Sequence, residues 1–113
     1  MKATLMFVPP GGGEADYSLL FELPSVPQRG DYISIRRHDQ QGTEDFVVRR
    51  SWWYLEHPET GAYETTRRAG SMAELGVECE FARGPYSSEE HRRECDAYDR
   101  GGREVQRFEA TAY

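Results

Sequence analysis

The segment Glu74-Leu75-Gly76-Val77-Glu78-Cys79-Glu80-Phe81 has the most regular alternation in this sequence. Its odd-numbered positions are apolar, and its even-numbered positions are glycine or glutamate. Successive side chains of a β-strand point to opposite faces, so this period of two predicts a strand. We expect the glutamate face to lie in water, where its charges protect a strand edge from aggregation. The residues expected to point inward are Leu75, Val77, Cys79 and Phe81.

Residues 45–57 are the most apolar segment, and they are long for a strand, whose usual length is about 5–6 residues. Their alternation changes phase along the segment. A bend or bulge near residues 49–51 would re-phase it and let one strand serve two sheets, as in small closed barrels. Because Trp52 has the same parity as Phe46 and Val48, we assign Trp52 to the core. Trp53 then points the other way and is a candidate contact residue.

Further strands are predicted on both sides of these two segments. The apolar start, residues 2–8, reads as a first strand that ends in the turn at residues 9–13. Alternation also predicts strands at residues 17–23 and 31–37, separated by a turn rich in proline and glycine. A polar hairpin loop at residues 38–44 and a turn at residues 58–61 follow, and residues 62–66 are expected to return as a short strand.

The character of the chain changes after Gly84. Ser87 and Glu90 have the spacing of a capping box, which predicts a helix that runs to about Arg100 and stops at Gly101-Gly102. Its apolar stripe is thin, so tertiary contacts must hold the helix in place. A last strand is expected within residues 104–113. We therefore expect one domain over residues 1–113, with a barrel core at about 2–82 and the helix and tail at 84–113.

A short motif within residues 17–57 resembles a known architecture. The pattern Leu23-Pro24-x-x-Pro27-x-x-Gly30-Asp31-x-Ile33, followed after a loop by Phe46-Val47-Val48-Arg49, resembles the strand-turn-strand core of small SH3-like barrels. It is also similar to small bacterial proteins of unassigned function that carry a Leu-Pro-x-Val-Pro-x-x-Gly-Asp stretch. The resemblance implies a mainly β fold, a small antiparallel SH3-like barrel or curved meander with one C-terminal helix. It implies no particular activity, since such barrels host many roles.

The charge of the chain limits the classes of partner. The net charge is −6 and the pI is near 5.1, which opposes non-specific binding to nucleic acid and to anionic membranes. No stretch approaches the ~20 apolar residues that cross a bilayer. The N-terminal residues lack the cleavage pattern of a signal peptide, so we expect a cytoplasmic protein with reduced cysteines.

Signatures of catalysis are lacking in the sequence. There is no Gly-x-Ser-x-Gly elbow, and Gly11-Gly12-Gly13 lacks the Lys-Ser/Thr of a phosphate-binding loop. His91 and Cys95, four residues apart on the predicted helix, could form three zinc ligands with Cys79. The paired short Cys-x-x-Cys spacing of structural zinc sites is missing, so we favour two buried thiols and a surface histidine, with no cofactor.

These observations favour a non-enzymatic interaction module that self-associates, or binds another protein, through an aromatic surface and its C-terminal tail. The expected contact residues are Trp53, Leu55, Tyr63, Tyr98 and Phe108. A first alternative is a single-stranded nucleic-acid binding protein that uses Arg37, Arg49 and Trp53, because arginines beside aromatic rings can hold phosphates and stacked bases. A second alternative is a small metal- or ligand-binding enzyme centred on Cys79, His91 and Cys95.

Overall fold

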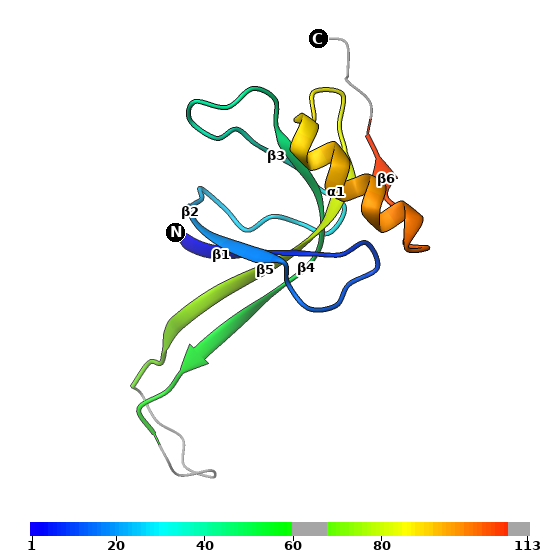
Figure 1. Cartoon of the computed structure of the whole chain (residues 1–113). Coiled ribbons are helices and arrows are strands. Elements are labelled where there is room, and N and C mark those ends of the chain that lie inside the picture. Colours follow the sequence, from blue (N-terminus) through cyan, green and yellow to red (C-terminus); the bar gives the residue numbers. More distant parts are fainter. Residues whose placement is uncertain (60–67, 109–113) are drawn as a thin grey trace.

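The computed structural model describes residues 1–59 and 68–108. Its strands form one strongly curled sheet, a half-barrel, with a single helix packed against one end (Figure 1). The expected mainly β fold with one C-terminal helix is confirmed. The elements are β1 (Lys2–Val8), β2 (Tyr17–Glu22), β3 (Tyr32–Ile35), β4 (Glu44–Glu56), β5 (Ser71–Arg83), α1 (Glu89–Arg100) and β6 (Gln106–Arg107).

The sheet has the strand order β2-β1-β5-β4-β3, and β6 pairs with β5 off this path. The pairings β1–β2, β3–β4 and β4–β5 are antiparallel, whereas β1–β5 and β5–β6 are parallel. The sheet is therefore mixed, with two parallel pairings where a small antiparallel barrel or curved meander was expected. The reason is topological: β1 lies beside β5, far from it in sequence, and no tight turn has to connect them.

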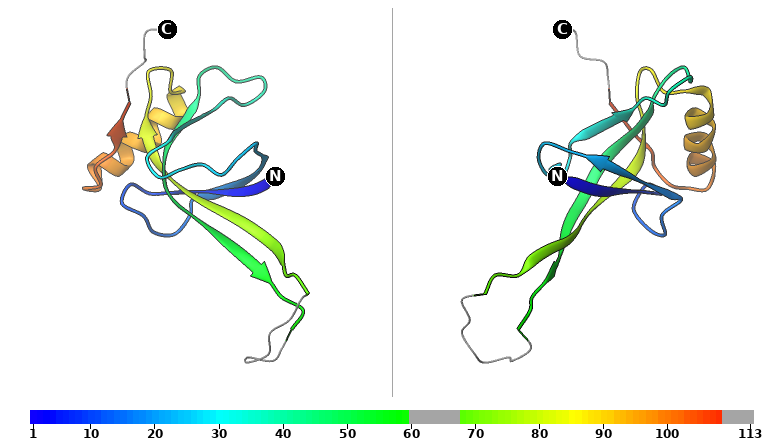
Figure 2. Two further views of the ribbon diagram at one scale, coloured as in Figure 1. Left: turned by 180° about the vertical axis from the view of Figure 1, so that it is seen from behind. Right: turned by 90° about the vertical axis from the view of Figure 1, so that its left-hand side faces the viewer.

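The predicted bulge in the long fourth strand is confirmed. The β4–β5 register shifts between Val48 and Arg50, and a second shift occurs between Tyr54 and Leu55. Before the first shift β4 lies between β3 and β5; beyond it, β4 pairs with β5 alone. Figure 2 shows this distal part of the hairpin projecting away from the half-barrel. We call residues 50–56 and 71–75 the arm.

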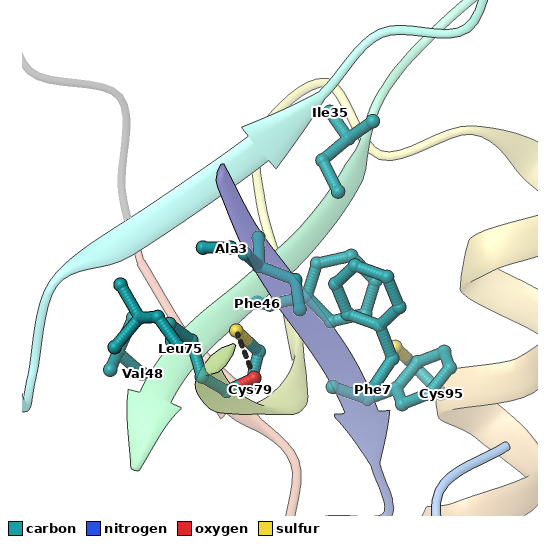
Figure 3. Close-up of a cluster of buried hydrophobic side chains, with 11 residues drawn as sticks. Ala3, Phe7, Ile35, Phe46, Val48, Leu75, Cys79 and Cys95 are labelled. Atoms are coloured by element: carbon teal, nitrogen blue, oxygen red, sulfur yellow. Dashed lines mark hydrogen bonds between the residues drawn. The ribbon is translucent and has the colours of Figure 1, made fainter. Parts of the chain in front are cut away.

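The concave face of the sheet carries the hydrophobic core. All four residues predicted to point inward from β5 are fully buried, and Phe7 and Phe46 stack above them with ring centroids 4.2 Å apart. Figure 3 shows these rings between β1 and β4, with Cys95 reaching them from α1. The core is Ala3, Leu5, Phe7, Ile35, Phe46, Val48, Leu75, Val77, Cys79, Phe81 and Cys95.

Two of the three glutamates on the opposite face of β5 are not in water, which contradicts the sequence-based expectation, whereas Glu74 is exposed as expected. Glu78 and Glu80 are only 7% and 5% exposed. Arg49, the residue at the bulge, lies across both, with its Nε 2.9 Å from Glu78 and a terminal nitrogen 3.2 Å from Glu80. Gln106 of β6 also donates to Glu80, at 2.6 Å. Buried carboxylates need partners of this kind. Arg49 lies on β4 and Gln106 on β6, so the alternation within β5 does not reveal either partner.

Helix α1 starts one residue later than the capping box predicts. Ser88, and not Ser87, is the N-cap, and its hydroxyl accepts from the backbone N–H of His91. The predicted stop is confirmed, since Gly101 is the C-cap. The thin stripe of the helix faces the core, so His91 is buried and stacks on Phe81 with centroids 5.3 Å apart. The expected surface histidine is therefore a core residue.

The C-terminal tail packs along its own sheet. β6 pairs with the end of β5, and the Phe108 ring lies 4.3 Å from that of Tyr32 on β3. Of the strand expected within 104–113, only Gln106–Arg107 is observed, and residues 109–113 lie outside the described part. The strand expected at 62–66 also falls outside it. No helix among the described residues has the length and apolar content to span a membrane.

Candidate functional site

The arm carries the densest group of exposed apolar side chains in the described chain. Trp53 is 48% exposed, Leu55 71% and Met72 42%, and Leu55 lies directly opposite Met72 across the two strands. Both side chains of this cross-strand pair leave apolar surface in water, and burying that surface would be favourable. Tyr54, on the same hairpin, is also more than half exposed. Exposed apolar residues gathered on a projecting element are typical of a contact surface.

The bulge at Arg49 decides which tryptophan faces which way. Residues directly opposite in an antiparallel pair share a face, and Trp53 lies opposite Leu75, a core residue. Trp52 lies opposite Gly76, on the other face of the sheet from Phe46 and Val48. The assignment of Trp52 to the core is therefore wrong. One extra residue at the bulge exchanges the two faces of the strand beyond it. Residues on either side of the bulge with the same parity therefore lie on opposite faces.

Trp52 is half-buried and held on the convex face. A Cβ on Gly76 would approach its indole to 2.9 Å, so the absence of a side chain at Gly76 lets the ring lie on the strand. The guanidinium of Arg50 lies 5.6 Å from the ring of Trp52, and the ring of Tyr54 is at 6.4 Å. Trp52 is thus packed on the sheet at the base of the arm. Trp53, with half of its surface in water, remains the better contact residue.

The five expected contact residues do not form one surface. Trp53 and Leu55 share the arm, whereas Tyr98 packs from α1 onto the core ring of Phe81 at 5.2 Å. The Phe108 ring lies against that of Tyr32 on β3. Both β3 and β6 are at the other end of the sheet from the arm (Figure 1). Tyr63 lies outside the described residues. The sequence indicated Trp53 and Leu55 as exposed residues, but it could not show that the tail would pack on its own chain.

The arginines proposed to contact nucleic acid are engaged in ion pairs. Arg49 bridges Glu78 and Glu80, and the Nε of Arg37 lies 2.6 Å from Glu44. A phosphate would have to displace a carboxylate at each position. The residues of this alternative are also dispersed, since Trp53 is on the arm and Arg37 follows β3. The arrangement gives no continuous basic groove of the kind that single strands require.

The zinc alternative lacks the necessary geometry. Among the described residues, no three His, Cys, Asp or Glu side chains are grouped to hold a metal ion. The Sγ of Cys79 points to the backbone oxygen of Val77, and that of Cys95 to the oxygen of Ala82. Burial raises the pKa of Cys79 to about 12 and that of Cys95 to about 11, so both are neutral thiols near pH 7.

A buried carboxylate that sequence reasoning missed lies where β4 begins. Asp45 is 1% exposed and accepts hydrogen bonds from the hydroxyls of Ser34 (2.6 Å), Thr43 (2.9 Å) and Ser87. A Cβ on Gly84 would meet this carboxylate at 2.8 Å. Asp45 thus links β3, the loop before β4 and the turn before α1 through hydrogen bonds to one carboxylate. An aspartate at the start of an apolar strand was the available signal, because Asp is depleted in strands.

The Nε2 of His91 reaches the same region. It lies 2.8 Å from the oxygen of Ala82 and 3.2 Å from the backbone nitrogen of Asp45. Depending on its tautomer, the ring donates to the first or accepts from the second. Every buried side-chain polar atom of the described residues has a partner. The buried polar groups of the Asp45 cluster thus bond to one another and link β3, β4 and the start of α1.

A polar hollow of about 320 Å³ lies between β2 and α1. Glu44, which lines it, accepts from the hydroxyl of Tyr17 and pairs with Arg37. Burial and the bond to Glu44 raise the pKa of Tyr17 far above its usual value, so the phenol keeps its proton. Burial, assisted by neighbouring carboxylates, also raises the pKa of Glu94. The hollow shows no activated nucleophile and no base paired with one.

Comparisons with known proteins identify no relative of this chain. No protein-family model matches it, and neither a curated protein nor a solved structure does so.

Proposed function

We propose that this chain is a non-enzymatic interaction module that self-associates through the arm. The observation that carries the proposal is the exposure of Trp53, Leu55 and Met72 on a two-stranded ribbon that projects beyond the core. A two-stranded ribbon is marginally stable in water when nothing packs on it. A partner that covers these side chains would stabilise the arm and remove apolar surface from water at the same time.

The free energy available from burying these side chains suits a weak, reversible complex. Burying an exposed Trp, Leu or Met side chain contributes about 1.5–3 kcal/mol when the burial is complete. Because these side chains are already about half buried, the gain from three of them on each protomer is comparable with the entropic cost of association, which favours weak binding. We expect Trp53 to be the anchor, since tryptophan is enriched among the residues that dominate binding energy.

We propose a second copy of the chain as the partner. A twofold contact brings the same patch of both protomers together, so each Trp53 meets apolar atoms of the other arm. The net charge of −6 per chain opposes the encounter. Added salt should therefore strengthen the complex, because it screens the repulsion and leaves the apolar contact in place. Nucleic-acid binding would respond in the opposite sense and weaken with salt.

Sedimentation velocity over a wide concentration range, at low and high salt, tests this proposal. The wild-type chain should shift from monomer to dimer, and a Trp53→Ser/Leu55→Ser double variant should need at least tenfold higher concentration. Tyr86→Ser is the matched control, because Tyr86 is 70% exposed and precedes α1, away from the arm. A wild-type chain that stays monomeric, or an arm variant that associates like the wild type, would contradict the proposal.

A further inference from the structure

The half-barrel is open along one side. In the described part of the chain, β2 and β3 are the two edge strands and are not paired with each other. Between them lies a cavity of about 540 Å³, whose walls come from β1, β2, β3 and the β2–β3 loop. Its lining is mainly apolar and includes Leu5, Phe21, Leu23, Ile33 and Ile35. The concave face of the sheet thus continues into an apolar groove that no strand closes.

The free edge of β3 offers backbone hydrogen bonds beside this groove. The backbone N–H of Val48 donates to the oxygen of Asp31 at 2.9 Å, so Asp31 faces β4. In an antiparallel ladder the residues that face the partner strand alternate with those that face away. Tyr32 and Ser34 therefore direct their backbone N–H and C=O groups to the open side. An extended segment lying there would extend the sheet and place every second side chain in the groove.

The charge at this edge indicates which segment would bind. The charged residues that line the groove are Arg36 and Asp31, and the carboxylate of Asp31 accepts from the backbone N–H of Gln28 at 2.8 Å. Arg36 follows directly after β3 and lines the groove, and no ion pair involves it within the described residues. The next arginine, Arg37, is already paired with Glu44. The groove therefore combines apolar walls with a cation that is available to a carboxylate.

We propose that the open side of the half-barrel binds an extended acidic segment of a partner protein, in which apolar residues alternate with Asp or Glu, by strand addition to β3. The apolar side chains enter the groove, and a carboxylate pairs with Arg36. This site is distinct from the arm. Its ligand is a different protein, and the two proposals can succeed or fail independently.

The test measures fluorescence anisotropy with two labelled ten-residue peptides, one of alternating Val and Glu, the other of alternating Val and Lys. The protein is the Trp53→Ser/Leu55→Ser variant, so that self-association does not enter. We expect the Val/Glu peptide to bind at least tenfold more tightly than the Val/Lys peptide. Arg36→Glu should reverse this preference. Arg92→Glu, on the exposed side of α1, should leave it unchanged.

N-methylation of the Val/Glu peptide tests the backbone pairing. Methylating the amides of one residue type, either Val or Glu, should abolish binding, and methylating the other should not, because only one set faces β3. No binding of the Val/Glu peptide, equal binding of both peptides, or insensitivity to Arg36→Glu would overturn the proposal. Equal effects of the two methylated series would also overturn it. Edge pairing by a second copy would instead appear as a dimer of the arm variant that the peptide does not dissociate.

Discussion

Trp53 and Leu75 lie directly opposite each other in the β4–β5 hairpin, yet Leu75 is fully buried and Trp53 is 48% exposed. This pair lies within the arm, at the level where the hydrophobic core ends. β1 pairs with β5 only from Gly76 onward. In residues 71–75, toward the tip of the hairpin, β5 pairs with β4 alone among the described strands. Trp53 extends the core surface into water, which makes it the natural anchor for a partner.

The two tryptophans should differ in their access to a quencher. With Trp52 replaced by Phe, the remaining Trp53 should be quenched by acrylamide more strongly than Trp52 is in the Trp53→Phe variant. The reason is that Trp52 is held between Gly76 and Arg50, whereas half of Trp53 is in water. Raising the protein concentration should protect Trp53 as the arms associate. Equal quenching constants in dilute solution would contradict the described faces of the arm.

Replacing Arg49 by Met should destabilise the fold by about 2 kcal/mol. Breaking a buried ion pair costs about 3–5 kcal/mol. The smaller figure allows for the solvent screening of Arg49, whose side chain is 35% exposed. Arg50→Met is the control, since Arg50 pairs with Glu78 alone and its side chain is 70% exposed. Urea unfolding measures both variants. If they lose the same stability, Arg49 is not the residue that neutralises Glu78 and Glu80.

Replacing Asp45 by Asn should destabilise the chain by about 2–3 kcal/mol, because hydrogen bonds to a charged acceptor are each worth about 1.5–3 kcal/mol and only part of them would survive. The loss should also loosen α1, since Ser87 links the carboxylate to the turn before the helix. Hydrogen exchange should therefore report faster opening of α1 amides. Asp39→Asn, in an exposed loop, is the control. Unchanged exchange in α1 would show that Asp45 does not hold the helix.

Stability should fall as the pH rises above about 9. Burial raises the pKa of Cys79 to about 12 and of Cys95 to about 11, from an ordinary value of 9.0. Below pH 9 both thiols are protonated in the folded and unfolded chains, so their contribution to stability is complete. Between pH 9 and 11 the unfolded chain loses these protons first. Each thiol then lowers the free energy of unfolding by up to about 1.4 kcal/mol per pH unit.

Urea unfolding under a phosphine reductant, with a Cys79→Ala/Cys95→Ala variant as control, checks this expectation. Tyr17 and Tyr98 also have raised pKa values and remain in both proteins. The informative quantity is therefore the difference between the two slopes. The variant should be less stable at pH 7, because a smaller side chain leaves space in the core. It should nevertheless lose less stability between pH 9 and 11. Parallel slopes would show that the thiols do not titrate on unfolding.

The local pattern of the sequence was sufficient for the elements and for much of the core. Alternation placed Leu75, Val77, Cys79 and Phe81 inside because a strand buries one parity when one face meets the core. The phase change near residues 49–51 predicted the bulge, and Gly101-Gly102 predicted the helix end. Each of these features depends on residues that are close in sequence, because the backbone geometry of a strand or a helix fixes where their side chains point.

Only the tertiary structure decided the contacts between distant segments. Glu78 and Glu80 were expected in water because their strand alone does not show that Arg49 and Gln106 cover them. Asp45 and His91 likewise have partners from other elements, and the open edge of β3 exists because β2 and β3 do not meet. The faces of Trp52 and Trp53 depend on one extra residue at Arg49. Alternation determines which residues share a face, but the pairing of strands across the chain determines what that face meets.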